Sequence, residues 1–293
     1  MQIAFHIGAH CTDEDRLLKS LLKNNDSLLQ QGIAVPGPGK YRSLIRETIQ
    51  GMAGTPTNPD TRDILLDAIV AADDLRRLVL SNDNFICVPN RIVEHGVFYA
   101  QAEAKTRGLH RLFPDDEISL FMAIRNPAAF LQDALPNVKI QDLGAWMGML
   151  SPEEIRWSDV IRRIKQGAPD TPLTIWCDED SPLLWDQLIH RICGVEPQGG
   201  LTGGLDRIAG LLSPEGMTLL TEKLAQSGDI TAPQRHEIIA DVWADHALTA
   251  QIEQDIDLPE LDAATVAHMS AAYEADLAVI AAMPGVELLL PFR

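Results

Sequence analysis

The loop after the first apolar segment carries most of the residue types that could do chemistry. Gln2–Ile7 is a short apolar run that stops at Gly8, and Thr12 precedes a leucine-rich helical pattern. Residues 8–15 between them read Gly-Ala-His-Cys-Thr-Asp-Glu-Asp. Free backbone N–H groups and the helix dipole favour an anion at such a strand–loop–helix junction. A nucleotide-hydrolysing loop would end in Gly-Lys-Ser/Thr, which is absent, so that class of enzyme is excluded.

The acidic residues of this loop also have a purely structural interpretation. Thr12 can cap the following helix, and three acids in its first turn complement the helix dipole. In that case the protein fills its own anion site with side chains. The residues alone leave this interpretation and an anion-binding role both open.

Residue types that bind metals are concentrated in the same stretch. They are His6, His10, Cys11, Asp13 and Asp15. Their spacing matches no standard zinc or calcium pattern, and His6 lies on the strand, where a core histidine is expected. We therefore predict no metal site, and metal binding by His6, His10, Cys11 and Asp13 stays a hypothesis.

Arg125 is the strongest single candidate for a functional residue outside the loop. It follows the unbroken apolar run Ile118–Ile124, and ligands bind at the carboxyl ends of parallel strands. The structural alternative is an ion pair between Arg125 and Asp133 or another acid.

Two further groups are weaker candidates. Glu94 and His95 could form a general acid–base pair if they lie in a loop, whereas adjacent strand residues would point to opposite faces. Lys40–Arg42 is a compact basic cluster that could reach an anion at the same edge, and its alternative is a solvated turn.

Two stretches share the order and spacing of a known family. His6-Ile7-Gly8 with Thr12 is the first, and Leu120–Pro127, ending in Ile-Arg-Asn-Pro, is the second. They resemble the sulfotransferase family, which opens with a strand, a His-Ile-Gly-x-x-Lys-Thr-Gly-Thr-Thr loop and a leucine-rich helix. Val79-Leu80-Ser81 is a weak match to that family's strand-edge serine segment. The resemblance covers roughly the first two-thirds of the chain.

The resemblance implies a cofactor and a set of contacts. The loop would hold the 5′ end of the sulfate donor 3′-phosphoadenosine 5′-phosphosulfate, and Arg125 would bind the donor's 3′-phosphate. The positions that correspond to the family's donor contacts are Gly8, Ala9, His10, Cys11, Thr12, Arg125 and Asp133.

Five of the family's donor-contact positions carry a different residue here. Cys11 replaces the lysine that touches the transferred sulfonate, and Asp13 replaces a glycine. Glu14 and Asp15 replace two hydroxyl residues, and Asp133 replaces a serine. A carboxylate about 4 Å from a donor phosphate costs on the order of 1–4 kcal/mol. The sequence therefore leaves two hypotheses: a sulfonate transferase acting on an unidentified acceptor, and a catalytically inactive binding or scaffold protein with a self-occupied anion site.

Composition narrows the range of partners. The 293-residue chain has a net charge of −18 and only 24 Lys and Arg residues, which are scattered, so we expect neither a nucleic-acid partner nor an anionic membrane surface. The partner would be a small molecule or a protein. The four cysteines show no CxxC pairing, and no signal peptide is visible, so we expect a cytoplasmic protein with free thiols.

Alternating strand and helix patterns must position these residues. Besides Gln2–Ile7 and Ile118–Ile124, the runs Phe85–Val88 and Leu173–Trp176 suit buried parallel strands, and Ile33–Val35 a brief one. Ile64–Val79 has a helical period. After a Gly-rich joint, helical patterns recur around Leu205–Leu212, Met217–Gln226, Arg235–Leu248 and Ala263–Ala281.

The fold class follows from this alternation. We predict a three-layer α/β sandwich with a central, mostly parallel sheet of the P-loop or sulfotransferase-like type, plus C-terminal helices. We place the α/β domain at residues 1–197 and a helical C-terminal subdomain, packed on it, at residues 198–293.

Overall fold

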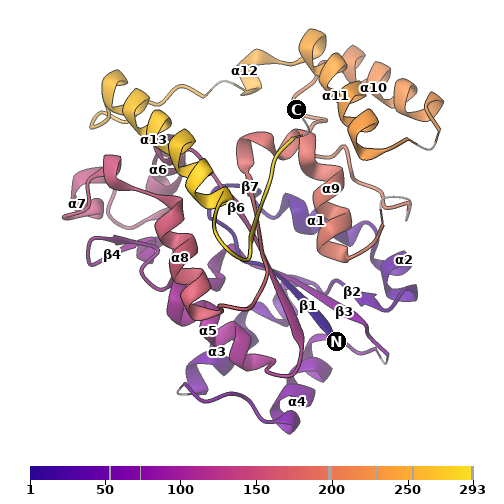
Figure 1. Cartoon of the computed structure of the whole chain (residues 1–293), viewed down its shortest axis with the longest axis vertical. Coiled ribbons are helices and arrows are strands. Elements are labelled where there is room, and N and C mark those ends of the chain that lie inside the picture. The colour runs from indigo at the N-terminus through magenta and orange to yellow at the C-terminus, as the bar shows by residue number, and fades with distance from the viewer. Residues whose placement is uncertain (53, 73, 197–199, 229, 253, 292–293) are drawn as a thin grey trace.

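A computed structural model describes residues 1–52, 54–72, 74–196, 200–228, 230–252 and 254–291 of the chain. Within these ranges the main sheet has six strands, all parallel, in the order β2-β3-β1-β6-β7-β8 (Figure 1). The strands are β1 (Gln2–His6), β2 (Ile33–Ala34), β3 (Arg77–Ser81), β6 (Glu117–Ile124), β7 (Leu173–Cys177) and β8 (Val286–Leu289). A separate antiparallel hairpin joins β4 (Val93–Glu94) to β5 (Val97–Phe98). The predicted α/β class with a parallel central sheet is confirmed.

Successive side chains of the central strands enter two different cores. In β1, Ile3 and Phe5 join the larger hydrophobic cluster, whereas Ala4 joins the smaller one on the opposite face. In β6, Met122 joins the larger cluster and Phe121 the smaller. This period of two on an apolar strand is what a sheet covered by helices on both faces requires.

Helices cover both faces of the sheet and make the three layers visible in Figure 1. The smaller core packs under α1 (Arg16–Leu22), α2 (Asn25–Gln30) and α9 (Ser181–Cys193). The larger core packs under α3 (Arg42–Gly51), α4 (Pro59–Ile69), α5 (Ala102–Leu112), α6 (Pro127–Ala134), α7 (Leu143–Met147), α8 (Trp157–Gly167) and α13 (Ala263–Ala281).

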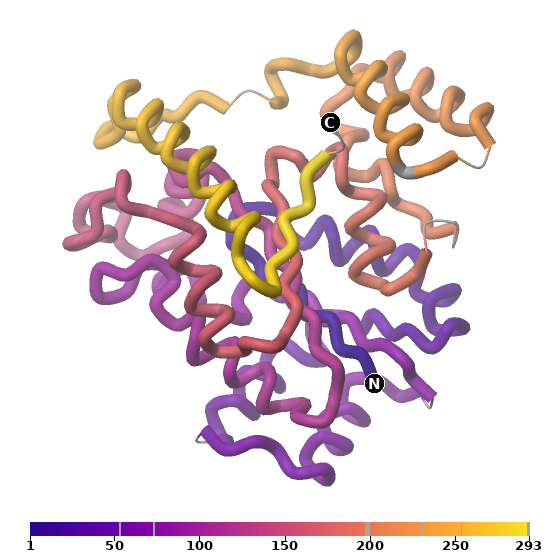
Figure 2. Tube along the Cα trace, viewed as in Figure 1, coloured from indigo at the N-terminus to yellow at the C-terminus, as the bar shows by residue number. Residues whose placement is uncertain are grey.

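The C-terminal part of the chain first leaves the sheet and then returns to it. The helices α10 (Pro214–Gln226) and α11 (Ala232–His246) form a lobe around a small core of their own, which is followed by α12 (Thr249–Ile252). The chain then enters α13 and ends in β8, which pairs with β7 (Figure 2). The segment expected to be a helical subdomain therefore also supplies the sixth strand. The expected boundary at residues 197/198 lies outside the described residues.

Several predicted elements are confirmed and others are wrong. The predicted first strand, the run Ile118–Ile124 and the run Leu173–Trp176 appear as β1, β6 and β7, and the last three predicted helices appear as α10, α11 and α13. The segment Leu205–Leu212 forms turns instead of a helix. Among the described residues, no helix combines the length and apolar character needed to cross a bilayer.

The largest error concerns the strand beside β1. Phe85–Val88 is not a strand, and its place in the sheet is taken by β3, which the sequence pattern assigned to the end of a long helix. That helix, α4, ends at Ile69. Phe85 belongs instead to a short 3-10 helix and packs its ring edge-on against Phe5, with centroids 5.4 Å apart. A short apolar run is found in buried turns as well as in buried strands, because any buried segment requires apolar side chains.

Candidate functional site

The carboxyl ends of β1, β6 and β7 meet at one edge of the sheet and bring the candidate residues together. The loop 8–15 follows β1, Arg125 follows β6 and Asp178 follows β7. Two cavities open at this edge, one of about 850 Å³ and one of about 650 Å³. Arg125 and Asp178 line the larger cavity, Cys11 lines the smaller, and Asp133 lines both. Ligand sites in open α/β sheets form at this edge.

The loop begins with a tight approach of backbone to backbone. Gly8 has φ of +106°, and a Cβ placed there would lie 3.3 Å from the carbonyl oxygen of Asp83. The Ala9 N–H donates to the Ala123 carbonyl at 2.9 Å, and the His10 N–H donates to the Tyr99 hydroxyl at 3.1 Å. These two backbone donors of the loop are therefore already used inside the protein.

Asp13 takes the position at which the start of a helix would hold an anion. Its buried carboxylate accepts the N–H of Leu17, in the first turn of α1, at 3.0 Å. Thr12, the residue predicted to cap this helix, instead donates its hydroxyl to the Ala9 carbonyl at 2.9 Å. The Asp13 carboxylate, and not the Thr12 hydroxyl, accepts an N–H of the first turn of α1, so the choice of Thr12 as the cap is wrong. Because α1 begins only at Arg16, Asp13 stands closer in the chain to the first free N–H groups of the helix than Thr12 does.

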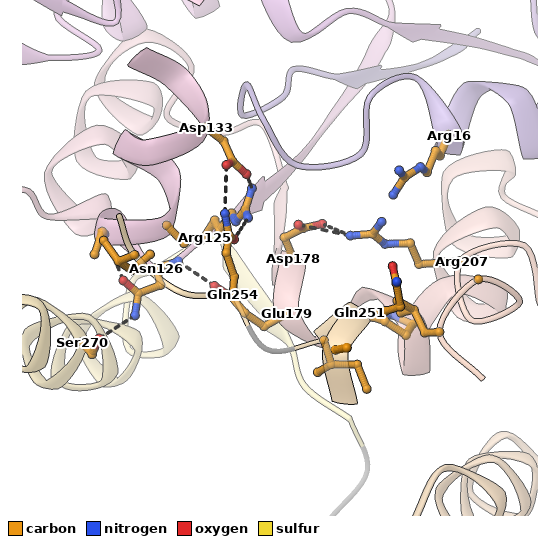
Figure 3. Close-up of a pocket in the computed structure, with 18 of the residues that line it drawn as sticks. Arg16, Arg125, Asn126, Asp133, Asp178, Glu179, Arg207, Gln251, Gln254 and Ser270 are labelled. Atoms are coloured by element: carbon orange, nitrogen blue, oxygen red, sulfur yellow. Dashed lines mark hydrogen bonds and ion pairs between the residues drawn. The ribbon is translucent and has the colours of Figure 1, made fainter. Parts of the chain in front are cut away.

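Arg125 is tied down by neighbours from two directions. Its Nη1 donates to the Cys11 carbonyl at 2.6 Å and lies 2.7 Å from Oδ2 of Asp133. Gln254 bridges the same pair, since it accepts from Arg125 and donates to Asp133 Oδ1 at 2.9 Å (Figure 3). The predicted ion pair between Arg125 and Asp133 is confirmed. The Arg125 guanidinium therefore binds the loop backbone at Cys11 and the Asp133 carboxylate at the same time.

Arg42 fixes the other end of the loop. Its Nη2 donates to Asp15 Oδ1 at 2.5 Å and to the Ser81 carbonyl at 3.1 Å. The adjacent Tyr41 is fully buried, donates to the same carbonyl at 2.7 Å, and has its pKa raised by burial. The cluster Lys40–Arg42 is therefore neither a solvated turn throughout nor a free cationic site, because Tyr41 and Arg42 are bound to β3 and to the loop.

The two histidines of the loop region have separate partners. His6 Nδ1 lies 2.9 Å from the Ser81 hydroxyl, and its ring stacks on Trp176 with centroids 5.7 Å apart. His10 Nδ1 lies 2.6 Å from the Tyr99 hydroxyl, and burial lowers the pKa of His10. Among the described residues, no group of three or more His, Cys, Asp and Glu side chains is placed to hold a metal ion.

The smaller cavity has an acidic wall and a protected thiol. Its charged and polar lining comes from His10, Cys11, Asp13, Glu14, Asp83, Gln132, Asp133 and Asn137. Burial, and next the negative charge of Asp133, raise the pKa of Cys11 to about 12. The thiol is therefore protonated near neutral pH and is a poor nucleophile. Cys11, Cys87, Cys177 and Cys193 are all free thiols, as the sequence predicted.

The larger cavity contains a charged pair that the sequence did not single out. Arg207, from the segment between α9 and α10, places Nη2 3.3 Å from Oδ2 of Asp178. Burial raises the pKa of Asp178 to about 7, against the opposite effect of Arg207. Glu179 follows Asp178 and binds the Asn126 N–H at 2.7 Å (Figure 3). The sequence does show two acids, Asp178 and Glu179, directly after a buried strand. That Arg207 contacts Asp178 follows only from the three-dimensional structure.

The other weak candidates lie elsewhere. Glu94 belongs to β4 and accepts from Gln101 at 2.9 Å, while His95 sits at the turn of the hairpin with φ of 54°. Neither residue lines either cavity. The two side chains are therefore not assembled as an acid–base pair at the sheet edge.

No protein-family model matches the chain, and neither the curated proteins nor the solved structures contain a significant match.

Proposed function

We propose that this chain is a non-catalytic binding protein built on a sulfotransferase-like framework, with its former donor loop closed by its own side chains. The observation that carries this proposal is the buried Asp13 carboxylate, which accepts the Leu17 N–H at the start of α1. A donor phosphate or sulfonate would need that N–H and the space beside it. The ligand site of such a protein is then the larger cavity, of about 850 Å³, which lies beside Arg125 and has none of residues 8–15 in its lining.

The charges around the loop support loss of the donor. Asp13 and Asp133 line the cavity directly above the loop, and Cys11 stands where a sulfotransferase has its lysine. Each carboxylate about 4 Å from a phosphate costs on the order of 1–4 kcal/mol, so two of them weaken binding by powers of ten. Without the lysine, the charge that develops on the transferred sulfonate has no cation to stabilise it.

The position of Arg125 supports the same proposal. To bind a 3′-phosphate, its guanidinium would have to leave the Cys11 carbonyl and Asp133, at 2.6 and 2.7 Å. Its side chain is only 15% exposed, so the released carbonyl and carboxylate would need new partners. In its present position Arg125 holds the loop against the sheet.

Calorimetric titration with 3′-phosphoadenosine 5′-phosphate tests the proposal. We expect no heat of binding at millimolar nucleotide for the wild-type protein. Saturable binding that Arg125→Ala abolishes, and that Arg46→Ala at an exposed position leaves intact, would instead support the donor-binding transferase. Incubation with labelled 3′-phosphoadenosine 5′-phosphosulfate gives a second measurement, in which donor turnover contradicts a non-catalytic role.

A further inference from the structure

Two guanidinium groups with unused donors lie on one side of the larger cavity. Figure 3 shows Arg207 and Arg16 together with Gln251, on the side away from Arg125. Arg207 contacts Asp178 through Nη2 alone, and its buried Nε has no hydrogen-bond partner among the described residues. Arg16 uses one nitrogen, Nη2, to reach Glu14 at 3.2 Å. The Arg16 side chain is half-exposed and its other donors can be hydrated, whereas the buried, unpaired Nε–H of Arg207 is costly, and an acceptor from outside the protein would satisfy it.

The acids of the cavity, in contrast, are engaged. Asp133 pairs with Arg125, and Glu179 accepts the Asn126 N–H at 2.7 Å. Asp206 accepts from Ser20 and Lys23, both at 2.6 Å. The unused hydrogen-bonding groups of the cavity are therefore the N–H donors of Arg207 and Arg16, and these donors favour an anionic ligand.

The rest of the lining sets the size and polarity of that anion. Apolar side chains share the cavity with the charged groups, namely Leu211, Trp243, Ile252, Ile256 and Val266. The volume of about 850 Å³ is within the range of small-molecule sites. A ligand that satisfies both parts of the lining has one acidic group and an apolar body.

We propose that this cavity binds a small organic monoanion, a carboxylate or a sulfonate, with its acid group on Arg207 and Arg16 and its apolar body against Trp243 and Leu211. The proposal rests on the proposed function, because it names the ligand class of a binding protein. An arginine fork matches the two oxygens of such an acid group. The raised pKa of Asp178 helps, since the carboxyl is partly protonated near neutral pH and then does not repel the ligand.

The charge balance of the lining argues against a polyanion. Three arginines face four acids around the cavity, namely Arg16, Arg125, Arg207, Asp133, Asp178, Glu179 and Asp206. A second negative charge on the ligand would meet these carboxylates, and the lining residues that the structure describes include no further cation to pair with it. The net charge of −18 adds an unfavourable field for a dianion.

Phenylacetate and phenylacetamide make a matched pair of probes, because they differ in the acid group alone. By calorimetry at pH 7 we expect saturable binding of phenylacetate and of benzenesulfonate, and binding of phenylacetamide that is at least tenfold weaker. Arg207→Gln should weaken phenylacetate binding by about tenfold or more, while Arg46→Gln, which removes an exposed arginine that does not line the cavity, should leave that binding unchanged.

A second variant guards against a folding defect. Arg207→Gln leaves Asp178 buried without its cation, so the double variant Arg207→Gln/Asp178→Asn restores a neutral pair and should still fail to bind phenylacetate. Equal binding of phenylacetamide, no binding of either acid at millimolar concentration, or tighter binding of the dianion phenyl phosphate would each overturn the proposal. The proposed function fails separately, through nucleotide binding that depends on Arg125.

Discussion

Asp178 and Arg207 face each other inside the larger cavity, with Oδ2 of the carboxylate 3.3 Å from Nη2 of the guanidinium. The pair comes from two distant parts of the chain, the residue after β7 and the segment before α10. Despite this partner, burial raises the pKa of Asp178 to about 7. Desolvation therefore outweighs attraction at this site, and the carboxyl of Asp178 is partly protonated near neutral pH.

The raised pKa of Asp178 makes its contribution to stability depend on pH. The folded state binds the Asp178 proton more tightly than the unfolded state, whose pKa is near 3.8, so the native protein loses stability as the pH rises from about 4 to about 7. Asp178→Asn cannot lose a proton and lacks this dependence. The free energy of unfolding of the variant minus that of the wild type should increase across this window, by on the order of 4 kcal/mol at most, and level off above it.

Urea denaturation of both proteins at several pH values between 4 and 8 measures this difference. The other groups near Asp178, which are Arg207, Arg125 and Glu179, are present in both proteins, so most of their pH dependence cancels. A difference that stays constant over the range would contradict the raised pKa.

Removal of the Asp13 carboxylate should destabilise the protein. Asp13→Ala leaves the Leu17 N–H without its acceptor in a buried position, which costs about 1–3 kcal/mol. Glu14→Ala is the matched control, because the neighbouring acid is 72% exposed and its pair with Arg16 contributes less than about 1 kcal/mol. Denaturation midpoints in urea give both values. If the two substitutions had the same effect, Asp13 would not hold the start of α1.

Gly8→Ala should destabilise the protein through the backbone. At φ of +106° an alanine is strained, and its Cβ would lie 3.3 Å from the Asp83 carbonyl oxygen, so we expect a loss of about 1–3 kcal/mol. Gly39→Ala is the control, since a Cβ at Gly39 meets nothing within 4 Å. It should change stability by less than about 1 kcal/mol. Thermal unfolding followed by circular dichroism checks both, and a tolerated alanine at Gly8 would argue against the observed loop conformation.

The pair Arg125–Asp133 should show energetic coupling. A double-mutant cycle with Arg125→Ala and Asp133→Ala should give about 1–3 kcal/mol, because the contact is 2.7 Å long and Arg125 is only 15% exposed. The exposed pair Arg46–Glu47 serves for comparison and should couple by less than about 0.5 kcal/mol. Equal coupling in the two cycles, measured by urea denaturation, would mean that the Arg125–Asp133 pair contributes no more than an exposed ion pair does.

Much of the fold could be predicted from local patterns. Unbroken apolar runs bounded by polar residues gave β1, β6 and β7, because strands buried on both faces need apolar residues at every position. The same reasoning placed a strand at Phe85–Val88 and none at β3, whose last residues, Val79-Leu80-Ser81, were indicated only by the weak match to the sulfotransferase family. Phe85, Ile86 and Cys87 are as buried as β3, although Val88 is exposed, so burial of the apolar run does not tell the two segments apart, whereas the pairing of β3 with β1 does.

The candidate site could be predicted in part. The acids of the loop were visible in the sequence as residue types at fixed spacings. The ion-pair partner of Arg125 was visible too, because Asp133 lies in α6, the helix that directly follows Arg125. Arg207 was not predictable, because it reaches the cavity through turns that follow the long helix α9. The contact between Arg207 and Asp178 depends on tertiary packing, which no local sequence pattern reveals.

The return of β8 to the sheet has a consequence for how the protein is made. Until α13 and β8 emerge from the ribosome, β7 is an open edge with unpaired N–H and C=O groups, and the whole helical lobe is synthesised in the meantime. An open parallel edge is a template for pairing with other nascent chains. β8 therefore moves the edge of the sheet from β7 to a four-residue strand, and removal of β8 should leave the longer β7 exposed as an edge that favours aggregation.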